Sequence, residues 1–134
     1  MKHILFLFVA LGLLTCCKTT TEKPAVETTQ EVVIPRIEVL DVPTFKDEIS
    51  NSKVQLVDVR TPEEYAEGHI KNARNIDFLA NDFSKAILKV DKDQPVYIYC
   101  RSGNRSGQAA QIMQKLGYKT IYDLKGGFLA WNGN

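Results

Sequence analysis

The sequence contains few thiol and imidazole side chains. Its 134 residues include three cysteines and two histidines. Cys16 and Cys17 are adjacent near the N-terminus, so Cys100 is the only cysteine in the rest of the chain. A zinc site needs about four protein ligands, and a disulfide or a Cys-X-X-Cys redox pair needs neighbouring thiols. We therefore expect no bound metal, no cofactor and no internal disulfide in the main part of the chain.

Long hydrophobic runs and an excess of one charge are missing as well. The apolar run Ile4–Leu14 is shorter than the about 20 residues that a membrane-spanning helix needs. Because it follows Lys2, it is typical of the hydrophobic part of a secretory signal peptide. The formal net charge is only +1, which argues against binding to nucleic acid or to a strongly anionic membrane surface.

The end of this apolar run resembles the lipobox of bacterial lipoproteins, in which a leucine precedes a lipidated cysteine. Leu13 precedes Cys16 and Leu14 precedes Cys17 with the lipobox spacing, and the flanking residues favour Cys17 as the attachment site. The resemblance implies a lipoprotein signal peptide over residues 1–16, with cleavage before Cys16 or Cys17. We therefore expect an exported lipoprotein of the cell envelope, held at a membrane by acyl chains.

The residues that follow the adjacent cysteines carry little apolar surface. Residues 17–35 are rich in threonine, glutamate and lysine, and they contain two prolines but no aromatic residue. Such a segment cannot bury enough apolar surface to offset the entropy cost of ordering, so we expect a flexible tether. Lys18 and Thr19 replace the aspartate that would suggest retention at the inner membrane. This favours the outer membrane, with the domain facing the periplasm or the surface.

Residues 36–134 have the pattern of one globular domain, expected to be a monomer, in which strands alternate with helices. Strands are expected at residues 36–40, 54–59, 73–76, 96–99 and 119–122, and helices at 43–49, 62–67, 77–90, 105–116 and 126–131. Thr61-Pro62-Glu63-Glu64 supplies a capping box for the second helix, and Gly68 ends it. This alternation predicts an α/β fold with a mainly parallel five-stranded sheet and helices on both faces.

Cys100 lies where the apolar strand at 96–99 ends and a glycine-containing loop begins. In parallel α/β sheets, ligands bind at this end of the strands, beside helix N-termini. Gly103 lets backbone N–H groups turn inward, and Arg101 and Arg105 add positive charge, so we expect an anion-binding loop that favours a reactive thiolate. The alternative is an inert core cysteine. No histidine lies in the loop, so a catalytic Cys–His pair is not expected.

The loop and its surroundings resemble the single-domain rhodanese family. The motifs that match, in the family's order, are LVDVR at 56–60, Glu63-Glu64-Tyr65, GHIKNARNI at 68–76, CRSGNRS at 100–106, and Gly126-Gly127 with Trp131. CRSGNRS corresponds to the active-site loop of the family. Asn72 is a departure, because the family often has glycine there, in the turn after His69.

The resemblance implies a rhodanese-like fold and sulfurtransferase activity. Cys100 would take a sulfane sulfur from a small anionic donor such as thiosulfate, hold it as a persulfide, and pass it to cyanide or a thiol. The residues implied to bind the substrate are Arg101, Ser102, Gly103, Asn104, Arg105 and Ser106. Asp58 and Arg60 would support the loop from the neighbouring strand. The residues for which structural roles are expected are Glu63, Glu64, His69 and Trp131.

Two other functions are alternatives to sulfur transfer. Four residues separate Cys100 from Arg105, one fewer than in the phosphate loop of tyrosine phosphatases that share the fold. The loop is therefore short for phosphate, which disfavours a phosphatase. A non-catalytic rhodanese-like module that binds a partner or senses sulfur species is the other alternative, and the intact cysteine disfavours it.

Overall fold

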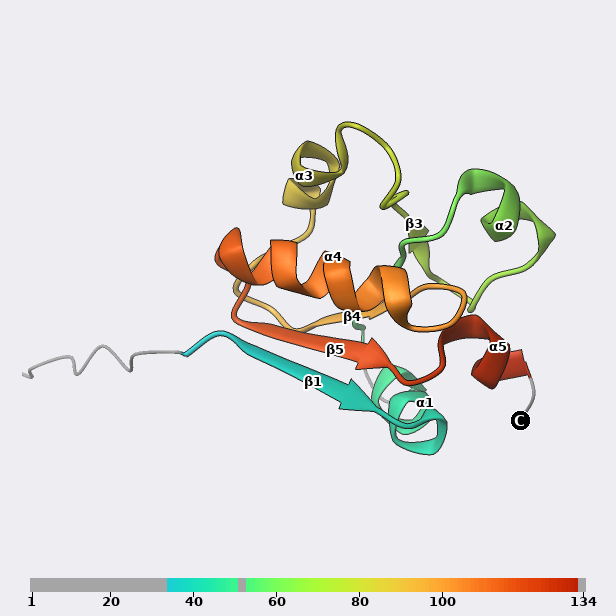
Figure 1. Cartoon of the computed structure of the whole chain (residues 1–134). Coiled ribbons are helices and arrows are strands. Elements are labelled where there is room, and N and C mark those ends of the chain that lie inside the picture. Colours follow the sequence, from blue (N-terminus) through green and yellow to red (C-terminus); the bar gives the residue numbers. More distant parts are fainter. Residues whose placement is uncertain (1–33, 51–52, 133–134) are drawn as a thin grey trace, which may run out of the picture. The chain divides into compact units, whose positions relative to one another are not determined.

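The structure is a computed structural model that describes residues 34–50 and 53–132 (Figure 1). The predicted signal peptide and nearly all of the predicted tether lie outside the described residues. The elements, in chain order, are β1 (Arg36–Leu40), α1 (Val42–Ser50), β2 (Gln55–Asp58), α2 (Pro62–Glu67), β3 (Arg74–Asn75), α3 (Phe83–Ala86), the 3₁₀ helix η1 (Ile87–Lys89), β4 (Val96–Tyr99), α4 (Asn104–Lys115), β5 (Thr120–Leu124) and α5 (Gly127–Asn132).

The strands form one parallel sheet, which confirms the predicted fold class. Their order is β1-β5-β4-β2-β3, so β1 and β3 are the edge strands. The pairings of β1 with β5, β5 with β4, β4 with β2 and β2 with β3 are all parallel. Parallel neighbours need crossover connections, and these crossovers carry the helices that cover the sheet. The carboxyl ends of β2, β4 and β5 therefore meet at one edge, where the site lies.

The central strand β4 contributes to two hydrophobic cores, one on each face of the sheet. Val96 and Ile98 belong to the core that contains residues of α3, η1 and α4, whereas Tyr97 and Tyr99 belong to the core that contains residues of α1. Figure 1 shows α3 and α4 on one side of the sheet and α1 on the other. Because both faces are covered, the strand is continuously apolar instead of alternating.

The helix predicted over residues 77–90 is wrong in its first half. Only α3 and η1 are helical, and the residues before α3 form turns. The Asp77 carboxylate accepts a hydrogen bond from the Leu79 N–H at 2.8 Å, and such local bonds compete with helix formation. Phe78 still reaches the core from the turn. Leu88 in η1 is 48% exposed, whereas Ile87 is fully buried.

The other elements begin and end within a few residues of the predicted positions. The change that matters for the site is at the last strand, which was predicted to end at Tyr122 but continues to Leu124. Asp123 therefore lies inside the sheet, opposite Ile98 of β4. An acidic residue is thus placed in the interior beside the loop that follows β4.

Candidate active site

Cys100 follows β4 directly, and its side chain is a free thiol with 1% exposure. The sulfur accepts a hydrogen bond from the Gly103 N–H at 3.1 Å and one from the Ser106 hydroxyl at 3.4 Å. Gly103 is the N-cap of α4 and has a left-handed φ of 96°, which turns its N–H toward the sulfur. Two donors and the helix N-terminus therefore converge on the thiol, an arrangement that stabilises negative charge on sulfur.

The outer side of the loop faces solvent beside a cavity. Arg101, Ser102 and Asn104, all predicted to bind substrate, are exposed. The cavity has a volume of about 320 Å³, and its lining includes Arg101 and Phe128. A small anion or a thiol would have room here, next to the loop that holds the sulfur.

The turn at Gly126-Gly127 packs directly on the backbone of the loop. The Phe128 N–H donates to the Cys100 carbonyl at 2.8 Å, and the Leu129 N–H donates to the Arg101 carbonyl at 3.0 Å. Gly127 has a φ of 59°, and a Cβ at this position would lie 2.5 Å from the Cys100 carbonyl oxygen. Glycine is therefore required at this position by both conformation and space, which gives the glycine pair of the sequence a structural reason.

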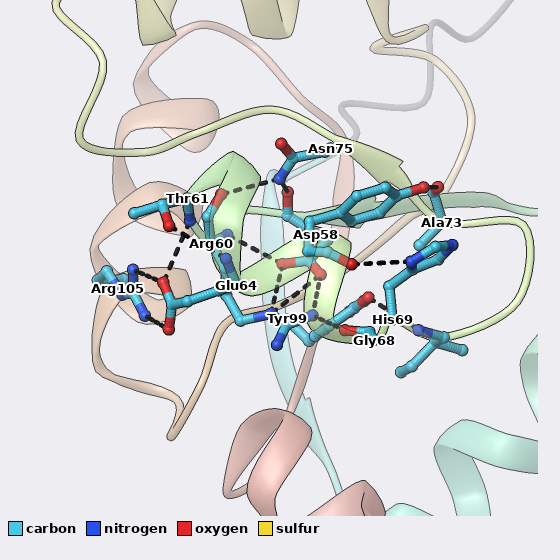
Figure 2. Close-up of polar contacts among 12 residues, drawn as sticks. Asp58, Arg60, Thr61, Glu64, Gly68, His69, Ala73, Asn75, Tyr99 and Arg105 are labelled. Atoms are coloured by element: carbon cyan, nitrogen blue, oxygen red, sulfur yellow. Dashed lines mark hydrogen bonds and ion pairs between the residues drawn. The ribbon is translucent and has the colours of Figure 1, made fainter.

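Arg105 is held by Glu64, the residue that closes the capping box of α2. Its two terminal nitrogens each lie 2.7 Å from a carboxylate oxygen of Glu64 (Figure 2). Glu64 also accepts the Thr61 N–H at 3.2 Å, and the Thr61 hydroxyl accepts the Glu64 N–H at 3.3 Å, which confirms the predicted capping box. The hydrogen bonds from Arg105 lower the pKa of Glu64 to about 2, against a raising effect of burial.

Asp58 and Arg60 form a buried ion pair at the end of β2. Nη2 of Arg60 lies 2.6 Å from Oδ2 of Asp58, and Nε lies 3.0 Å from both carboxylate oxygens. Arg60 also donates to the Gly68 carbonyl at 2.7 Å, and its guanidinium carbon lies 4.1 Å from the centroid of the Phe128 ring. Because Phe128 binds the Cys100 carbonyl, the pair connects β2 to the loop. The predicted role of Asp58 and Arg60 is to support the loop that holds Cys100, and it requires such contacts. This role stays a prediction.

His69 is placed by contacts with Tyr65. Its Nδ1 lies 3.0 Å from the Tyr65 carbonyl oxygen, and the two rings stack with centroids 3.8 Å apart. Trp131 packs edge-on against Phe45 in the core on the α1 side. Asn72, the departure from the family pattern, has a left-handed φ of 67°. Asparagine tolerates this conformation better than most residues, so it can replace glycine in the turn.

Asp123 is a buried acid that the sequence analysis did not single out. It is 4% exposed, and its Oδ1 has no hydrogen-bond partner among the described residues. Burial raises its pKa to about 6, although hydrogen bonds with the Ser106 side chain and the Leu124 backbone lower it. The signal in the sequence was an aspartate within the largely apolar stretch TIYDL, which one lysine separates from the glycine pair.

The described residues offer neither a metal-binding cluster nor a membrane-spanning helix. Across 34–50 and 53–132, histidine, cysteine, aspartate and glutamate side chains form no group of three or more that could hold a metal ion. In the part of the chain that the structure describes, the helices are too short or too polar to cross a bilayer.

The parallel sheet and the loop after its central strand define the class of protein. Residues 41–134 match the rhodanese-like domain family. This span includes Cys100, its loop and the Gly126-Gly127 turn. The chain belongs to the rhodanese-like domain family.

The chain is also similar to individual proteins and to solved structures. The chain is 49% identical over 81 residues to the uncharacterized protein YqhL of Bacillus subtilis, covering 60% of this chain and 63% of that protein. It is 41% identical over 78 residues to a sulfurtransferase of Allochromatium vinosum, covering 58% of this chain and 71% of that protein. The crystal structure of a rhodanese-like domain protein from Staphylococcus aureus is similar with a TM-score of 0.63 and 32% identity, covering 70% of this chain and 90% of that one.

Proposed function

We propose that the protein is a sulfurtransferase whose nucleophile is Cys100. The observation that carries the proposal is a buried thiol at the end of β4 whose sulfur accepts hydrogen bonds from the loop, at 3.1 Å from Gly103 and 3.4 Å from Ser106. Membership of the rhodanese-like domain family and similarity to a sulfurtransferase support this chemistry. The two arginines of the loop suit an anionic donor, for which thiosulfate is the test compound.

Sulfur transfer would proceed by two displacements. In the first, the Cys100 thiolate attacks the outer sulfur of thiosulfate, the sulfur–sulfur bond of the donor breaks, and sulfite leaves with the bonding electron pair. The negative charge then lies on the terminal sulfur of the Cys100 persulfide. In the second, cyanide or a thiolate attacks this terminal sulfur, and Cys100 leaves again as a thiolate.

The loop would stabilise the charge at both stages. Gly103 and Ser106 hold the Cys100 sulfur, and the N–H groups of residues 101–106 would surround the terminal sulfur of the persulfide. Arg101, which is exposed at the neighbouring cavity, would meet the sulfonate end of the donor. Arg105 would have to share its guanidinium between the donor and Glu64.

The proposal is tested with the full chain carrying Cys16→Ser and Cys17→Ser, so that Cys100 is the only thiol. After incubation with thiosulfate, mass spectrometry should show the addition of one sulfur atom, and added cyanide should remove it as thiocyanate. The same chain with Cys100→Ser is the control and should show neither. Absence of both the adduct and thiocyanate would contradict sulfur transfer and favour the non-catalytic module.

The phosphatase alternative is measured in parallel on the same preparation. Hydrolysis of an aryl phosphate that depends on Cys100, without thiocyanate formation, would replace the proposed function. We expect no such hydrolysis, because the loop is one residue shorter than a phosphate loop between Cys100 and Arg105.

We also propose that the chain is exported and anchored by lipid at Cys17, or at Cys16, with the domain on the periplasmic or outer surface of the outer membrane. The support is the leucine spacing before each cysteine and the preceding apolar run. Metabolic labelling with a fatty acid should mark the protein, and the label should disappear when both cysteines are replaced by serine. Label that persists in the double variant would exclude anchoring at these residues.

A further inference from the structure

Asp123 places a carboxyl group in the interior, on the sheet side of the catalytic loop. It lies in β5 opposite Ile98 of β4 and is 4% exposed. Its Oδ1 has no hydrogen-bond partner among the described residues. A carboxylate in this position would be a buried charge with one unsatisfied oxygen, which is a costly state. A carboxyl group that holds a proton avoids the buried charge.

No cation in the described residues forms an ion pair with Asp123. The other residues of β5 are uncharged, as are β4 and α5. In β1, Arg36 pairs with Glu38. In α4, Arg105 is engaged by Glu64, and Lys115 lies in the last turn, at the end of the helix away from the loop.

The tyrosines that neighbour Asp123 in the sheet lie on its other face. Tyr97, Tyr99 and Tyr122 belong to, or pack against, the core on the α1 side. Asp123 shares its face with Ile121, two residues earlier in β5, which belongs to the core that contains residues of α4. Tyr118 belongs to the same core, but its hydroxyl donates to the Val90 carbonyl at 3.2 Å. The other ionisable group of this core is the Cys100 thiol, which the loop holds at the start of α4.

Ser106 connects the two groups. It is completely buried, its hydroxyl lies 3.4 Å from the Cys100 sulfur, and its side chain lowers the pKa of the Asp123 carboxyl group, against the raising effect of burial. The Asp123 carboxyl group also packs against the next residue of α4, because a Cβ at Gly107 would be in van der Waals contact with Oδ2 of Asp123, at 3.8 Å. The first turn of α4 therefore places one hydroxyl between a thiol and an acid.

A hydroxyl group carries a single proton and can donate it to only one acceptor at a time. If Asp123 is ionised, its charge attracts the Ser106 proton, and the sulfur loses this donor. If Asp123 is protonated, it can donate to Ser106, and Ser106 donates to the sulfur. The thiolate therefore has both of its donors, Gly103 and Ser106, only when Asp123 holds a proton.

We propose that Asp123 is the internal proton acceptor for the Cys100 thiol, acting through Ser106. The S–H bond of Cys100 breaks as its proton moves to the Ser106 oxygen, and the Ser106 proton moves to Asp123. One S–H bond is replaced by one carboxyl O–H bond, Ser106 is regenerated, and the total charge is unchanged. The product state is a thiolate with two hydrogen-bond donors beside a neutral acid.

Asp123 thus acts on Cys100 through Ser106, and it touches neither the sulfur donor nor the sulfur acceptor. The inference rests on the proposed function, because it concerns the thiol that the function uses. Its test measures ionisation of Cys100 without any sulfur donor, so its failure is distinguishable from an absence of sulfur transfer.

The test measures the rate at which iodoacetamide alkylates Cys100 as a function of pH, because only the thiolate reacts. The protein is the full chain with Cys16→Ser and Cys17→Ser. Four forms are compared: the parent, Asp123→Asn, Ser106→Ala, and the combination of the last two. Asparagine keeps the shape of Asp123 and can donate to Ser106, but it cannot accept the proton.

For the parent we expect a rate that rises in two steps separated by about one pH unit or more, because two coupled groups titrate as a pair. Asp123→Asn should leave a single step. In the Ser106→Ala background, Asp123→Asn should change the dependence of the alkylation rate on pH several-fold less than it does in the parent. Two steps that persist in Asp123→Asn would exclude Asp123, and an equal effect in both backgrounds would exclude the route through Ser106.

A second measurement does not depend on the folding of these variants. The carboxyl carbon of Asp123 is titrated by NMR in the parent and in Cys100→Ala, since coupling between two sites is reciprocal. We expect a two-step titration in the parent and a single step without the thiol. Identical titration curves in the two proteins would overturn the inference.

Discussion

At the scale of the residue, the loop that holds Cys100 depends on backbone contacts that leave no space for a side chain. Gly127 shows this most clearly, because its α-carbon faces the carbonyl oxygens of Cys100 and Arg101. The next two N–H groups of the chain, from Phe128 and Leu129, donate to these same carbonyls. A methyl group at residue 127 would therefore push the loop away from α5.

Gly127→Ala is expected to destabilise the protein by about 2 kcal/mol or more, through an unfavourable left-handed backbone and the clash with the loop. It should also reduce persulfide formation at Cys100 at least about tenfold, by displacing the donors of the sulfur. Chemical denaturation and the mass-spectrometric assay with thiosulfate measure the two effects.

Gly117→Ala is the matched control for this prediction. Gly117 also has a positive φ, 92°, but a Cβ there would meet nothing within 4 Å. We expect a stability loss of about 1 kcal/mol and unchanged persulfide formation. If both variants form the persulfide equally well, the contact between Gly127 and the loop does not matter for the chemistry.

At the scale of the element, the start of α2 does more than begin a helix. Glu64 closes the capping box with Thr61 and at the same time holds both terminal nitrogens of Arg105 in the first turn of α4. The side chains of this ion pair are only 20% and 23% exposed. The relative position of α2 and the loop that holds Cys100 is therefore maintained by a charge pair that also occupies Arg105.

Glu64→Gln should lower the free energy of unfolding at neutral pH by about 1–2 kcal/mol, between the values typical of exposed and buried ion pairs. Glutamine can still close the capping box, so the loss reports mainly the interaction with Arg105. Because the guanidinium is then free to bind an anion, we also expect KM for thiosulfate to fall several-fold.

Glu63→Gln removes a neighbouring charge from the exposed side of α2 and serves as the control. It should leave both stability and KM nearly unchanged. A KM that is the same in Glu64→Gln and in the parent would show that Arg105 does not meet the donor.

At the scale of the whole molecule, two opposite pKa shifts determine how stability depends on pH. The pKa of Asp123 is about 6 in the folded protein against an unperturbed value of 3.8, because burial disfavours its charge. Stability from this group is present below pH 3.8 and is lost as the pH rises toward 6. The pKa of Glu64 is about 2 against 4.5, because Arg105 favours its charge. Stability from this group is present above pH 4.5 and is lost as the pH falls toward 2.

The free energy of unfolding is therefore expected to increase as the pH is lowered from 7 to about 4, and to decrease again at lower pH. Asp123→Asn should be more stable than the parent at pH 7, by about 2–3 kcal/mol at most, and should lose the increase between pH 6 and 4. Urea denaturation at a series of pH values measures both curves. Parallel curves for the two proteins across this range would contradict the raised pKa of Asp123.

Much of this architecture could be predicted from local patterns. The strand that became β4 is apolar throughout, and the capping box at Thr61–Glu64 has a signature that is complete within a few residues. The helix expected over residues 77–90 was wrong in its first half, because apolar spacing cannot show that Asp77 binds the backbone of Leu79 and favours a turn.

The sequence by itself determined most of the order of the elements, the parallel sheet, and the position of Cys100 at the carboxyl end of an apolar strand, because these follow from periodicity and from turn and capping residues. The tertiary structure alone decided that Arg105 is bound by Glu64, that Ser106 donates to the sulfur, and that Asp123 is buried against the first turn of α4. The two members of the Arg105–Glu64 ion pair are 41 residues apart in the sequence. Such contacts depend on how β2, β4 and β5 assemble side by side, which no local pattern encodes.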